Sequence, residues 1–388
     1  MPVLTPAQAA AIATGVYALQ SRAVSTLASE GTPLGIEGLF ATGDADQLRG
    51  VSGALTRTEI TGFGYIAQGV GTFRGQALVA LRGTDSLADG LTDATIGAAT
   101  GPTGSAVHSG FNTTWNSFAP SVQTFFRSHR PPVIHCVGHS LGGALATLAA
   151  DYLSANTGAL VELYTFGSPR VGGLAFAREL SRRLTSDRIH RVYHPADPVA
   201  MVPLFPFLHL PFSGHGVSLP CDTTARISPD AHRMISSYLP GVANMSWSQL
   251  RANGTQTLSE RQIKAWLARA SQGQGVIALG ARTQELIAIA LDWILRQCAT
   301  VALIGLQSLI GGGLTLMDQL AYLLQRGAEV SRQVAGYVES LIMVILRFVG
   351  RSVQSGLFLT QQFIRWVLEI LTSTIRAMVS AGIGLASQ

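Results

Sequence analysis

The sequence has a single lysine and three cysteines, and it contains no proline beyond Pro240. Cys136, Cys221 and Cys298 lie far apart, which excludes a disulfide framework and a zinc-binding pattern, so no metal site is predicted. No basic run with interleaved aromatic residues occurs, which argues against nucleic acid as a partner. Almost all of the 27 basic residues are arginines, Lys264 being the exception. This usage suggests a GC-rich, bacterial genome.

The N-terminus also lacks the basic segment that opens a signal peptide, so no secretory leader is predicted. Only 13% of the 388 residues are charged. The mean hydropathy of +0.31 is high for a freely soluble protein. The chain is long enough for one large or two ordinary domains. We expect a protein that is membrane-associated or that leaves a bacterial cytoplasm by a leaderless route.

The most specific pattern that is present is G-H-S-L-G at residues 138–142. An apolar run at residues 132–137 precedes it and predicts a buried strand, and a small-residue helix follows at residues 144–150. Strand, tight turn, serine and helix form the context of a nucleophile elbow. The alternative is an ordinary structural turn. The context favours Ser140 as a catalytic nucleophile, with the N-terminus of the next helix aimed at the site.

A serine nucleophile needs a histidine base and an acid that orients the histidine. In hydrolases with a G-x-S-x-G elbow, the acid follows the serine in the sequence and the histidine comes last. Asp197 follows an apolar stretch that predicts a strand, and it lies in a loop marked by Pro195 and Pro198. The alternative is a turn aspartate beside proline. The position at the end of a strand favours Asp197 as the acid of a triad.

The histidine is harder to choose among the nine in the chain. His232 lies in a loop that opens the last helix of this part of the sequence, and we expect it to be the base. His215, just before an expected short strand, is the alternative, and His209 lies in an apolar loop. His139 adjoins the nucleophile, but we expect its side chain to point away from the elbow. Structural roles are expected for His129, His135 and His190.

Four blocks of sequence together resemble the class 3 lipases, the fungal-type branch of the α/β-hydrolases, over residues 1–242. The first block is V-A-L-R-G-T at 79–84, and the second is V-H-S-G-F at 107–111 with Trp115. The third is the elbow followed by T-F-G-S-P-R-V-G at 165–172, and the fourth is Asp197 followed by A-H-R-M at 231–234 and Tyr238. The resemblance implies a triad of Ser140, Asp197 and His232.

The same resemblance implies an oxyanion hole. One donor is the backbone N–H of Leu141, and the other is Thr84, through its N–H and its hydroxyl. The alternative role of Thr84 is to cap a turn. Residues 86–106 correspond to the lid of the family, with a flexible glycine-rich part at 97–104. Leu81 departs from the family, which usually has an aromatic residue there.

The remainder of the chain has a different character. Residues 246–258 are polar and predict a linker between a hydrolase domain, residues 1–245, and an all-helical domain, residues 259–388. After a short helix at 259–271 we expect three long helices, at about 275–309, 315–349 and 352–382. Their polar residues fall on narrow stripes, so the apolar face of each helix is wider than a surface helix needs.

Three interpretations of these helices are open. They form a bundle that packs on the hydrolase or on a partner, they bind the membrane interface, or they span the membrane. Residues 297–317 are an uncharged stretch of 21 residues, long enough for a span but interrupted by glutamines and glycines. We therefore expect residues 274–388 to contact a membrane surface, a protein partner or a second copy of the chain.

The sequence thus predicts an α/β fold, with an α/β-hydrolase core and an additional C-terminal helical domain. The expected function is hydrolysis of carboxylic esters of lipids, of the phospholipase A or acylglycerol lipase type, with no cofactor. One alternative is a membrane-disrupting or pore-forming protein that acts through the C-terminal helices. Another is an esterase of soluble esters such as feruloyl esters.

Overall fold

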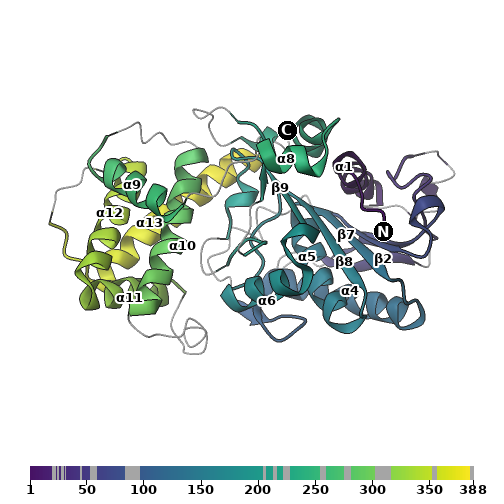
Figure 1. Cartoon of the computed structure of the whole chain (residues 1–388), viewed down its shortest axis with the longest axis horizontal. Coiled ribbons are helices and arrows are strands. Elements are labelled where there is room, and N and C mark those ends of the chain that lie inside the picture. Colours follow the sequence, from purple (N-terminus) through teal and green to yellow (C-terminus); the bar gives the residue numbers. More distant parts are fainter. Residues whose placement is uncertain are drawn as a thin grey trace. The chain divides into compact units, whose positions relative to one another are not determined.

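The computed structural model forms two compact units, the first comprising residues 1–203, 207–220 and 229–255 and the second residues 204–206, 221–228 and 256–388. Figure 1 shows a sheet with covering helices in the first unit and helices α9 to α13 in the second. The structure describes residues 1–19, 23, 26–27, 30, 32–43, 46–52, 59–83, 97–203, 207–212, 216–221, 228–253, 259–274, 281–301, 316–351 and 356–384.

A mixed sheet lies at the centre of the first unit, and in the described residues it has eight strands in the order β1-β3-β4-β7-β8-β9-β10, with β2 paired to β3. β3 pairs antiparallel with β1, β2 and β4, whereas β4, β7, β8, β9 and β10 run parallel. The strands are β1 (Phe40–Ala41), β2 (Gln47–Ser52), β3 (Glu59–Gly69), β4 (Ala77–Leu81), β7 (Val133–His139), β8 (Leu160–Phe166), β9 (Ile189–Tyr193) and β10 (Val217–Ser218), with a separate hairpin of β5 (Ala98–Thr100) and β6 (Ala106–His108).

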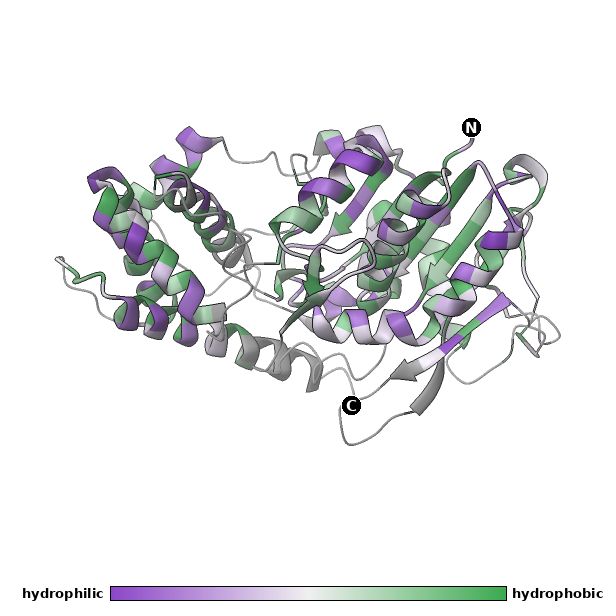
Figure 2. Cartoon of the chain, turned by 90° about the horizontal axis from the view of Figure 1, so that it is seen from below, coloured by the Kyte–Doolittle hydropathy of each residue, from purple (hydrophilic) through white to green (hydrophobic). Residues whose placement is uncertain are grey.

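Helices cover both faces of this sheet (Figure 1), as its parallel strands require, because strands such as β4 and β7 are buried along their whole length. One layer consists of α5 (Leu141–Asn156), which packs on β4, β7 and β8, together with α4 (Ser109–Ser128), which packs on β2, and α6 (Leu174–Leu184), which packs on β8. The opposite layer contains α1 (Pro6–Gly15), α7 (Leu239–Val242) and α8 (Trp247–Asn253). Figure 2 shows the hydrophobic character of the strands between these layers.

Side chains alternate between the two faces along each strand. Val137 of β7 belongs to the core that also contains residues of α1, such as Ile12 and Ala13. The alternation therefore directs His135 and His139 to the α1 face as well, and Cys136 to the opposite face. All seven residues of β7 are buried, so both histidines need partners within the protein.

The glycine-rich segment at residues 97–104 contains β5, which pairs antiparallel with β6, and the turn between the two strands. The Thr103 hydroxyl donates a hydrogen bond to the buried carboxylate of Asp151 at 2.8 Å. Asp151 also pairs with Arg183 of α6. Side-chain bonds thus fasten this turn to two helices, despite its glycines. The preceding part of the expected lid, residues 84–96, lies outside the described residues.

The predicted linker at residues 246–258 is wrong in part. Residues 247–253 form α8, which packs near β10. The Trp247 indole N–H donates to the carbonyl of Leu4 at 2.8 Å, and its ring packs against that of His190, with ring centroids 4.4 Å apart. This helix therefore belongs to the first unit, because an aromatic side chain among polar neighbours anchors it there. Residues 254–258 lie outside the described residues.

Every regular element in the described part of the second unit is a helix. The elements are α9 (Glu260–Ser271), α10 (Ala281–Val301), α11 (Leu316–Val330), α12 (Arg332–Phe348) and α13 (Gln361–Gly384). α11 packs against α10, α12 and α13, and α12 packs against α9. The buried residues recur at three- and four-residue spacing, as on α10: Ile287, Ala290, Leu291, Ile294, Leu295 and Cys298.

The boundaries of these helices differ from those predicted. The single helix expected at 315–349 is two helices, because Ser331 is extended (φ −136°, ψ 119°) and its side chain accepts the N–H of Val334 as an N-cap. The last helix begins at Gln361 rather than 352. No helix in the described ranges combines the length and hydropathy needed to cross a bilayer. Residues 302–315 of the uncharged stretch lie outside those ranges.

Candidate active site

Ser140 lies on a sharp turn between β7 and α5, and its backbone is strained. Its φ of 59° and ψ of −133° are rare for a residue with a side chain. The flanking glycines allow this turn because strand and helix touch there. A Cβ at Gly138 would lie 2.1 Å from the carbonyl oxygen of Gly142, and a Cβ at Gly142 would lie 2.2 Å from that of Leu81. The motif thus folds into the strand–turn–helix that the sequence predicts.

Ser140, His232 and Asp197 form a continuous series of hydrogen bonds. The Ser140 hydroxyl oxygen lies 2.8 Å from Nε2 of His232, and Nδ1 of His232 lies 2.8 Å from Oδ2 of Asp197. Asp197 is fully buried and Ser140 is 3% exposed, whereas the His232 side chain is 19% exposed. In the neutral imidazole, Nδ1–H donates to the carboxylate, which leaves Nε2 free to accept the serine proton.

The carboxylate of Asp197 is held by donors besides His232. The Tyr238 hydroxyl donates to Oδ2 at 2.5 Å, and the backbone N–H of Val199 donates to Oδ1 at 2.8 Å. Burial alone raises the pKa of Asp197, but the charge of His232 and these hydrogen bonds outweigh burial, so the pKa is lowered. Asp197 therefore stays ionised beside the histidine.

The residues expected to form the oxyanion hole are only partly described. Leu141 opens α5 directly after Ser140, where a helix has backbone N–H groups without intrahelical partners. Thr84 lies outside the described residues. The turn just before it is well fixed: the buried guanidinium of Arg82 donates to the carbonyl oxygens of Gly62 at 2.5 Å and Gly83 at 2.6 Å.

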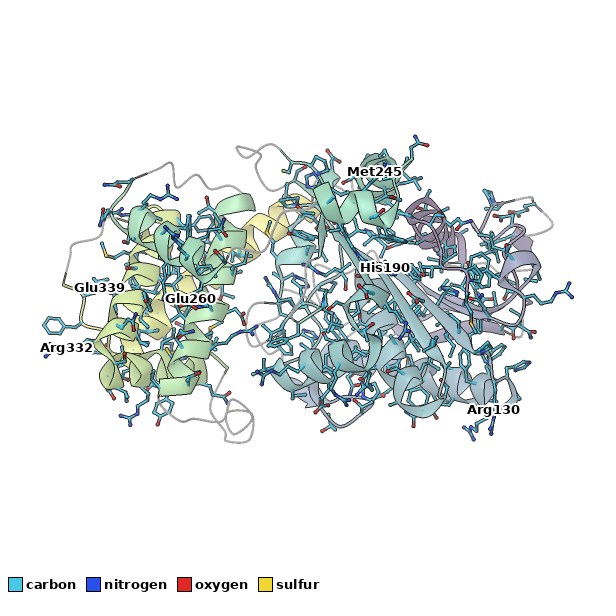
Figure 3. The ribbon with its side chains drawn as sticks, in the orientation of Figure 1. Arg130, His190, Met245, Glu260, Arg332 and Glu339 are labelled. Atoms are coloured by element: carbon cyan, nitrogen blue, oxygen red, sulfur yellow. The ribbon has the colours of Figure 1, made fainter. Side chains whose placement is uncertain are left out.

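The other candidate histidines have partners away from Ser140. His135 bonds to Gln76 and Tyr164, and His190 bonds to Glu162. His129 lies at the end of α4, where its Nδ1 is 3.1 Å from the carbonyl oxygen of Phe125. The alternative base, His215, lies outside the described residues. Figure 3 shows His190 on the sheet of the first unit.

His139 does not simply point away from the site, contrary to our expectation. Its ring centroid lies 4.5 Å from that of His232, and its Nε2 lies 2.7 Å from the His232 carbonyl oxygen. Tyr17 contacts the other ring nitrogen. Sequence reasoning missed Tyr17 because no motif marks it. The sequence analysis named Tyr238, six residues after His232, only as part of the family pattern and did not predict its hydrogen bond to Asp197.

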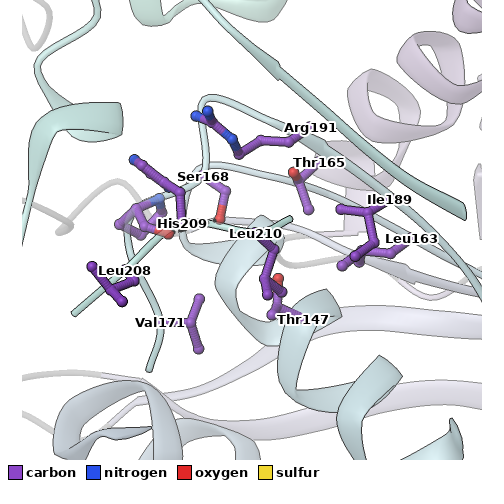
Figure 4. A pocket seen from close by; sticks show the side chains of 11 residues that line it. Thr147, Leu163, Thr165, Ser168, Val171, Ile189, Arg191, Leu208, His209 and Leu210 are labelled. Atoms are coloured by element: carbon purple, nitrogen blue, oxygen red, sulfur yellow. Dashed lines mark hydrogen bonds between the residues drawn. The ribbon is translucent and has the colours of Figure 1, made fainter. Parts of the chain in front are cut away.

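A pocket lies between α5, β8, β9 and residues 207–212 (Figure 4). Its polar lining residues are Thr147, Thr165, Ser168, Arg191 and His209. His209 donates through Nε2 to the carbonyl of Ala200 at 2.7 Å. Burial, with the nearby arginines, lowers the pKa of His209 well below its usual value. Ser140, His232 and Asp197 do not line this pocket, and His209 bonds to the Ala200 carbonyl rather than to Ser140.

The parallel strands on either side of β7, with the tight serine turn leading into a buried helix, define the α/β-hydrolase fold. Residues 78–207 match the family described as Lipase (class 3). This match confirms the resemblance to class 3 lipases in that range. The matched range contains Ser140 and Asp197 but ends before His232, so the position of His232 beside Ser140 rests on the structure.

Individual lipases are also similar to part of this chain. Secreted mono- and diacylglycerol lipase 1 of Fusarium solani is 35% identical over 160 residues, which are 39% of this chain and 46% of the relative. A lipase of Rhizopus niveus is 34% identical over 140 residues, 33% of this chain and 35% of the relative. A crystal structure of a lipase from Rhizopus microsporus var. chinensis is 24% identical, covers 63% of this chain and 84% of its own, and has a TM-score of 0.39.

The chain spans less than half the length of these curated relatives. They come from fungi, and a further relative, 30% identical, comes from the nematode Caenorhabditis elegans. The expectation of a bacterial protein exported by a leaderless route finds no support among them. Several of the fungal relatives are named as secreted proteins.

Proposed function

We propose that the chain is a serine hydrolase that cleaves carboxylic esters of lipids, with Ser140, His232 and Asp197 as its catalytic triad. The observation that carries this proposal is the hydrogen-bond series from Ser140 through His232 to Asp197, with both contacts at 2.8 Å. Few arrangements of a serine, a histidine and a buried carboxylate serve another purpose. The series assembles from three loops far apart in sequence.

In the proposed reaction, the Ser140 oxygen attacks the acyl carbonyl while Nε2 of His232 takes the hydroxyl proton. Asp197 keeps the imidazole oriented and stabilises the imidazolium. His232 then gives the proton to the leaving alcohol, and the acyl-enzyme forms. A water molecule then attacks the acyl-enzyme while His232 takes its proton, and His232 returns that proton to the Ser140 oxygen as the bond to the acyl group breaks and the fatty acid leaves. The N–H of Leu141, with Thr84, stabilises the negative oxygen of each tetrahedral intermediate. These steps require no cofactor.

The substrate class that we propose is acylglycerols. The relatives named as mono- and diacylglycerol lipases support this choice over phospholipids. Their names favour neither the feruloyl esterase nor the pore-forming alternative. A panel of mono-, di- and triacylglycerols and phospholipids, with product identification by mass spectrometry, tests the substrate class. Release of fatty acid from phospholipid alone would contradict the choice of acylglycerols.

The test of the nucleophile is Ser140→Ala. We expect ester hydrolysis to fall to background, by about 10⁶-fold in kcat, with an unchanged fold. Ser168→Ala is the matched control, because Ser168 is also buried but donates to the Pro169 carbonyl at 3.1 Å. Turnover that survives Ser140→Ala would overturn the proposal.

We also propose that the second unit binds a lipid surface through the connection between α12 and α13. Phe358 is 88% exposed between Leu357 and Leu359, and Trp366 of α13 is 40% exposed. The Arg351 guanidinium lies 5.1 Å over the Trp366 ring. Exposed apolar and indole groups beside arginine suit the boundary between acyl chains and anionic headgroups.

The overall charge of this region supports the same partner. Residues 256–388 contain eleven Lys and Arg against seven Asp and Glu, a net charge of +4. Figure 3 shows Arg332 and Glu339 on the helices of this unit. Glu339 lies close to the apolar connection, where it accepts the N–H of Gly356 at 3.3 Å. Each basic residue near an anionic surface contributes about 1 kcal/mol to binding.

The test is flotation of the full chain with phosphatidylglycerol vesicles. Phe358→Ser should weaken vesicle binding several-fold and leave hydrolysis of a soluble ester unchanged. Val330→Ser is the matched control, because Val330 is 54% exposed at the end of α11. If Phe358→Ser changes the sedimentation coefficient but not vesicle binding, the connection is a self-association surface and the membrane proposal is wrong.

A further inference from the structure

A chain of hydrogen bonds joins the backbone of His232 to the backbone of Gly83 through two side chains that the proposed reaction does not use. His139 Nε2 lies 2.7 Å from the His232 carbonyl oxygen. His139 Nδ1 lies 2.7 Å from the Tyr17 hydroxyl oxygen, and the Gly83 N–H donates to that hydroxyl at 3.2 Å. The chain thus links the histidine loop, the elbow and the turn that begins at Arg82.

The chemistry of the groups fixes the direction of every bond in this chain. A carbonyl oxygen only accepts, so Nε2 of His139 carries the proton and donates to His232. In a neutral imidazole the other nitrogen, Nδ1, is then an acceptor, so the Tyr17 hydroxyl must donate to it. The oxygen of Tyr17 is left to accept the N–H of Gly83. Each group makes the bond that its partner requires, so the chain has one consistent arrangement.

The two ends of this hydrogen-bond series lie at the histidine base and at the turn of the expected oxyanion hole. These two parts of the site must keep a fixed position relative to each other. One end holds the main chain of His232, whose side chain contacts Ser140. At the other end, a Cβ on Gly83 would lie 3.0 Å from Cβ of Ser140 and 2.7 Å from the Tyr17 oxygen. Gly83 is therefore packed directly against the elbow, one residue before the expected oxyanion donor Thr84.

We infer that His139 and Tyr17 are positioning residues that hold the histidine base and the oxyanion turn at a fixed separation around Ser140. This inference rests on the proposed function. A reacting group misplaced by about 1 Å costs about 100-fold in rate. The oxyanion and the imidazolium both form in the transition state, so fixing their separation affects kcat rather than substrate binding.

The electrostatic state of His139 suits this role. Burial, together with the charge of His232, lowers the pKa of His139 to about 3. Its buried ring lies near the Tyr17 and His232 rings, with centroids at 5.7 Å and 4.5 Å. A second cation at this distance would oppose protonation of His232. Because His139 stays neutral, it fixes the base without repelling the imidazolium that forms during the reaction.

The first test compares Tyr17→Phe with Tyr164→Phe. Both hydroxyls belong to tyrosines of the first unit, bond to Nδ1 of a buried histidine and lie near a backbone N–H: for Tyr164 the distances are 3.3 Å to His135 and 3.2 Å to Leu4. We expect Tyr17→Phe to lower kcat on a soluble ester 10- to 100-fold with KM within twofold. Tyr164→Phe should leave kcat within twofold, although it lowers the melting temperature.

The second test separates the two hydrogen bonds that His139 makes, one to the His232 carbonyl and one to the Tyr17 hydroxyl. In His139→Gln the amide nitrogen can still donate to the His232 carbonyl, and in His139→Asn the amide oxygen can still accept from Tyr17. His139→Leu loses both bonds. We expect kcat to fall in the order wild type, the two amide variants, then His139→Leu, with KM little changed. An equal loss in all three variants would overturn the positioning role.

Labelling of Ser140 by a fluorophosphonate gives a second readout that does not depend on the choice of ester. We expect its rate to follow kcat across these variants, because phosphonylation uses the same base and oxyanion donors. If the wild-type chain neither hydrolyses esters nor reacts with the probe, the proposed function fails and the positioning role fails with it. If the wild type reacts and Tyr17→Phe behaves like Tyr164→Phe, the positioning role alone is overturned.

Discussion

The two units differ in what they bury. The first unit encloses charged and polar side chains such as Arg82, His139, Asp151 and Asp197, whereas the buried polar residues described in the second unit are Ser271 and Gln319. Charged residues of the second unit pair on its surface instead, for example Arg326 with Glu329.

A buried polar group costs free energy unless its hydrogen bonds are satisfied, so each such group in the first unit fixes a geometry. The second unit is held by apolar stripes, which tolerate small shifts between helices. Surface ion pairs add little to its stability. This difference in buried polar groups indicates that the first unit is suited to catalysis and the second to docking. A reaction needs polar groups in fixed positions, and a docking surface does not. It also predicts that mutations in the two units will have separable effects.

The largest expected effect is on the triad. His232→Ala and Asp197→Asn should each lower kcat on a soluble ester by 10³-fold or more, because the serine loses its base or the base loses its orientation. Arg365→Ala removes the contacts of Arg365 with Asp318 and Glu369 in the second unit and should leave kcat within twofold. Steady-state kinetics with circular dichroism checks both. Near-full turnover in His232→Ala would contradict the assignment of the base and direct the search to His215.

A smaller but still severe effect is expected at glycines in tight contacts. Gly142→Ala places a Cβ 2.2 Å from the Leu81 carbonyl, so we expect the first unit to lose about 3 kcal/mol and its ester hydrolysis. Gly327→Ala places a Cβ 2.6 Å from Cβ of Cys298, between α10 and α11.

Gly327→Ala should destabilise the second unit and leave soluble-ester hydrolysis intact. Thermal unfolding followed by circular dichroism, with an activity assay on the same samples, measures both effects. Loss of activity in Gly327→Ala would show that the two units do not behave separately.

Acid should also distinguish the units, because all nine histidines lie between residues 108 and 232. Burial lowers the pKa of His108 to about 4 and that of His135 to about 3. Their pKa in the unfolded chain is about 6.5, so the stability they contribute is complete above pH 6.5. It falls as the pH drops towards 4, by about 1.4 kcal/mol per pH unit for each histidine.

Thermal unfolding at pH 7.5 and pH 5 measures this loss. The transition of the first unit should shift to lower temperature at pH 5, and that of the second unit should move much less. His135→Gln should reduce the shift of the first unit. An equal shift of both transitions would contradict the prediction that acid destabilises mainly the first unit.

The smallest expected effect is a gain in stability. Gly336 lies on the exposed face of α12, and a Cβ added there meets no atom within 4 Å. Gly336→Ala should stabilise the second unit by about 0.5–1 kcal/mol, because alanine loses less backbone entropy in a helix. Denaturant unfolding measures the gain. A loss of stability would indicate that this face of α12 is not free in solution.

The sequence alone predicts the elements whose form depends on neighbouring residues. The elbow follows from Gly138 and Gly142, because only glycines permit the close approach of strand and helix around Ser140. Asp197 was placed by the strand before it, and α9 was expected at 259–271, close to its observed range Glu260–Ser271. In each case residues close together in the sequence determine the local structure.

Tertiary structure decided what depends on residues far apart in the chain. The break at Ser331, between α11 and α12, was not visible in a continuous apolar pattern, and Trp247 turned an expected linker into α8 by reaching Leu4. The role that we infer for His139 depends on Tyr17, 122 residues away. Alternation along β7 fixes the face that His139 occupies, but only the packing of the N-terminal segment on that face supplies its partner. The reason is physical: a buried donor or acceptor must be satisfied by whatever group folding brings to it, and local sequence does not encode that group.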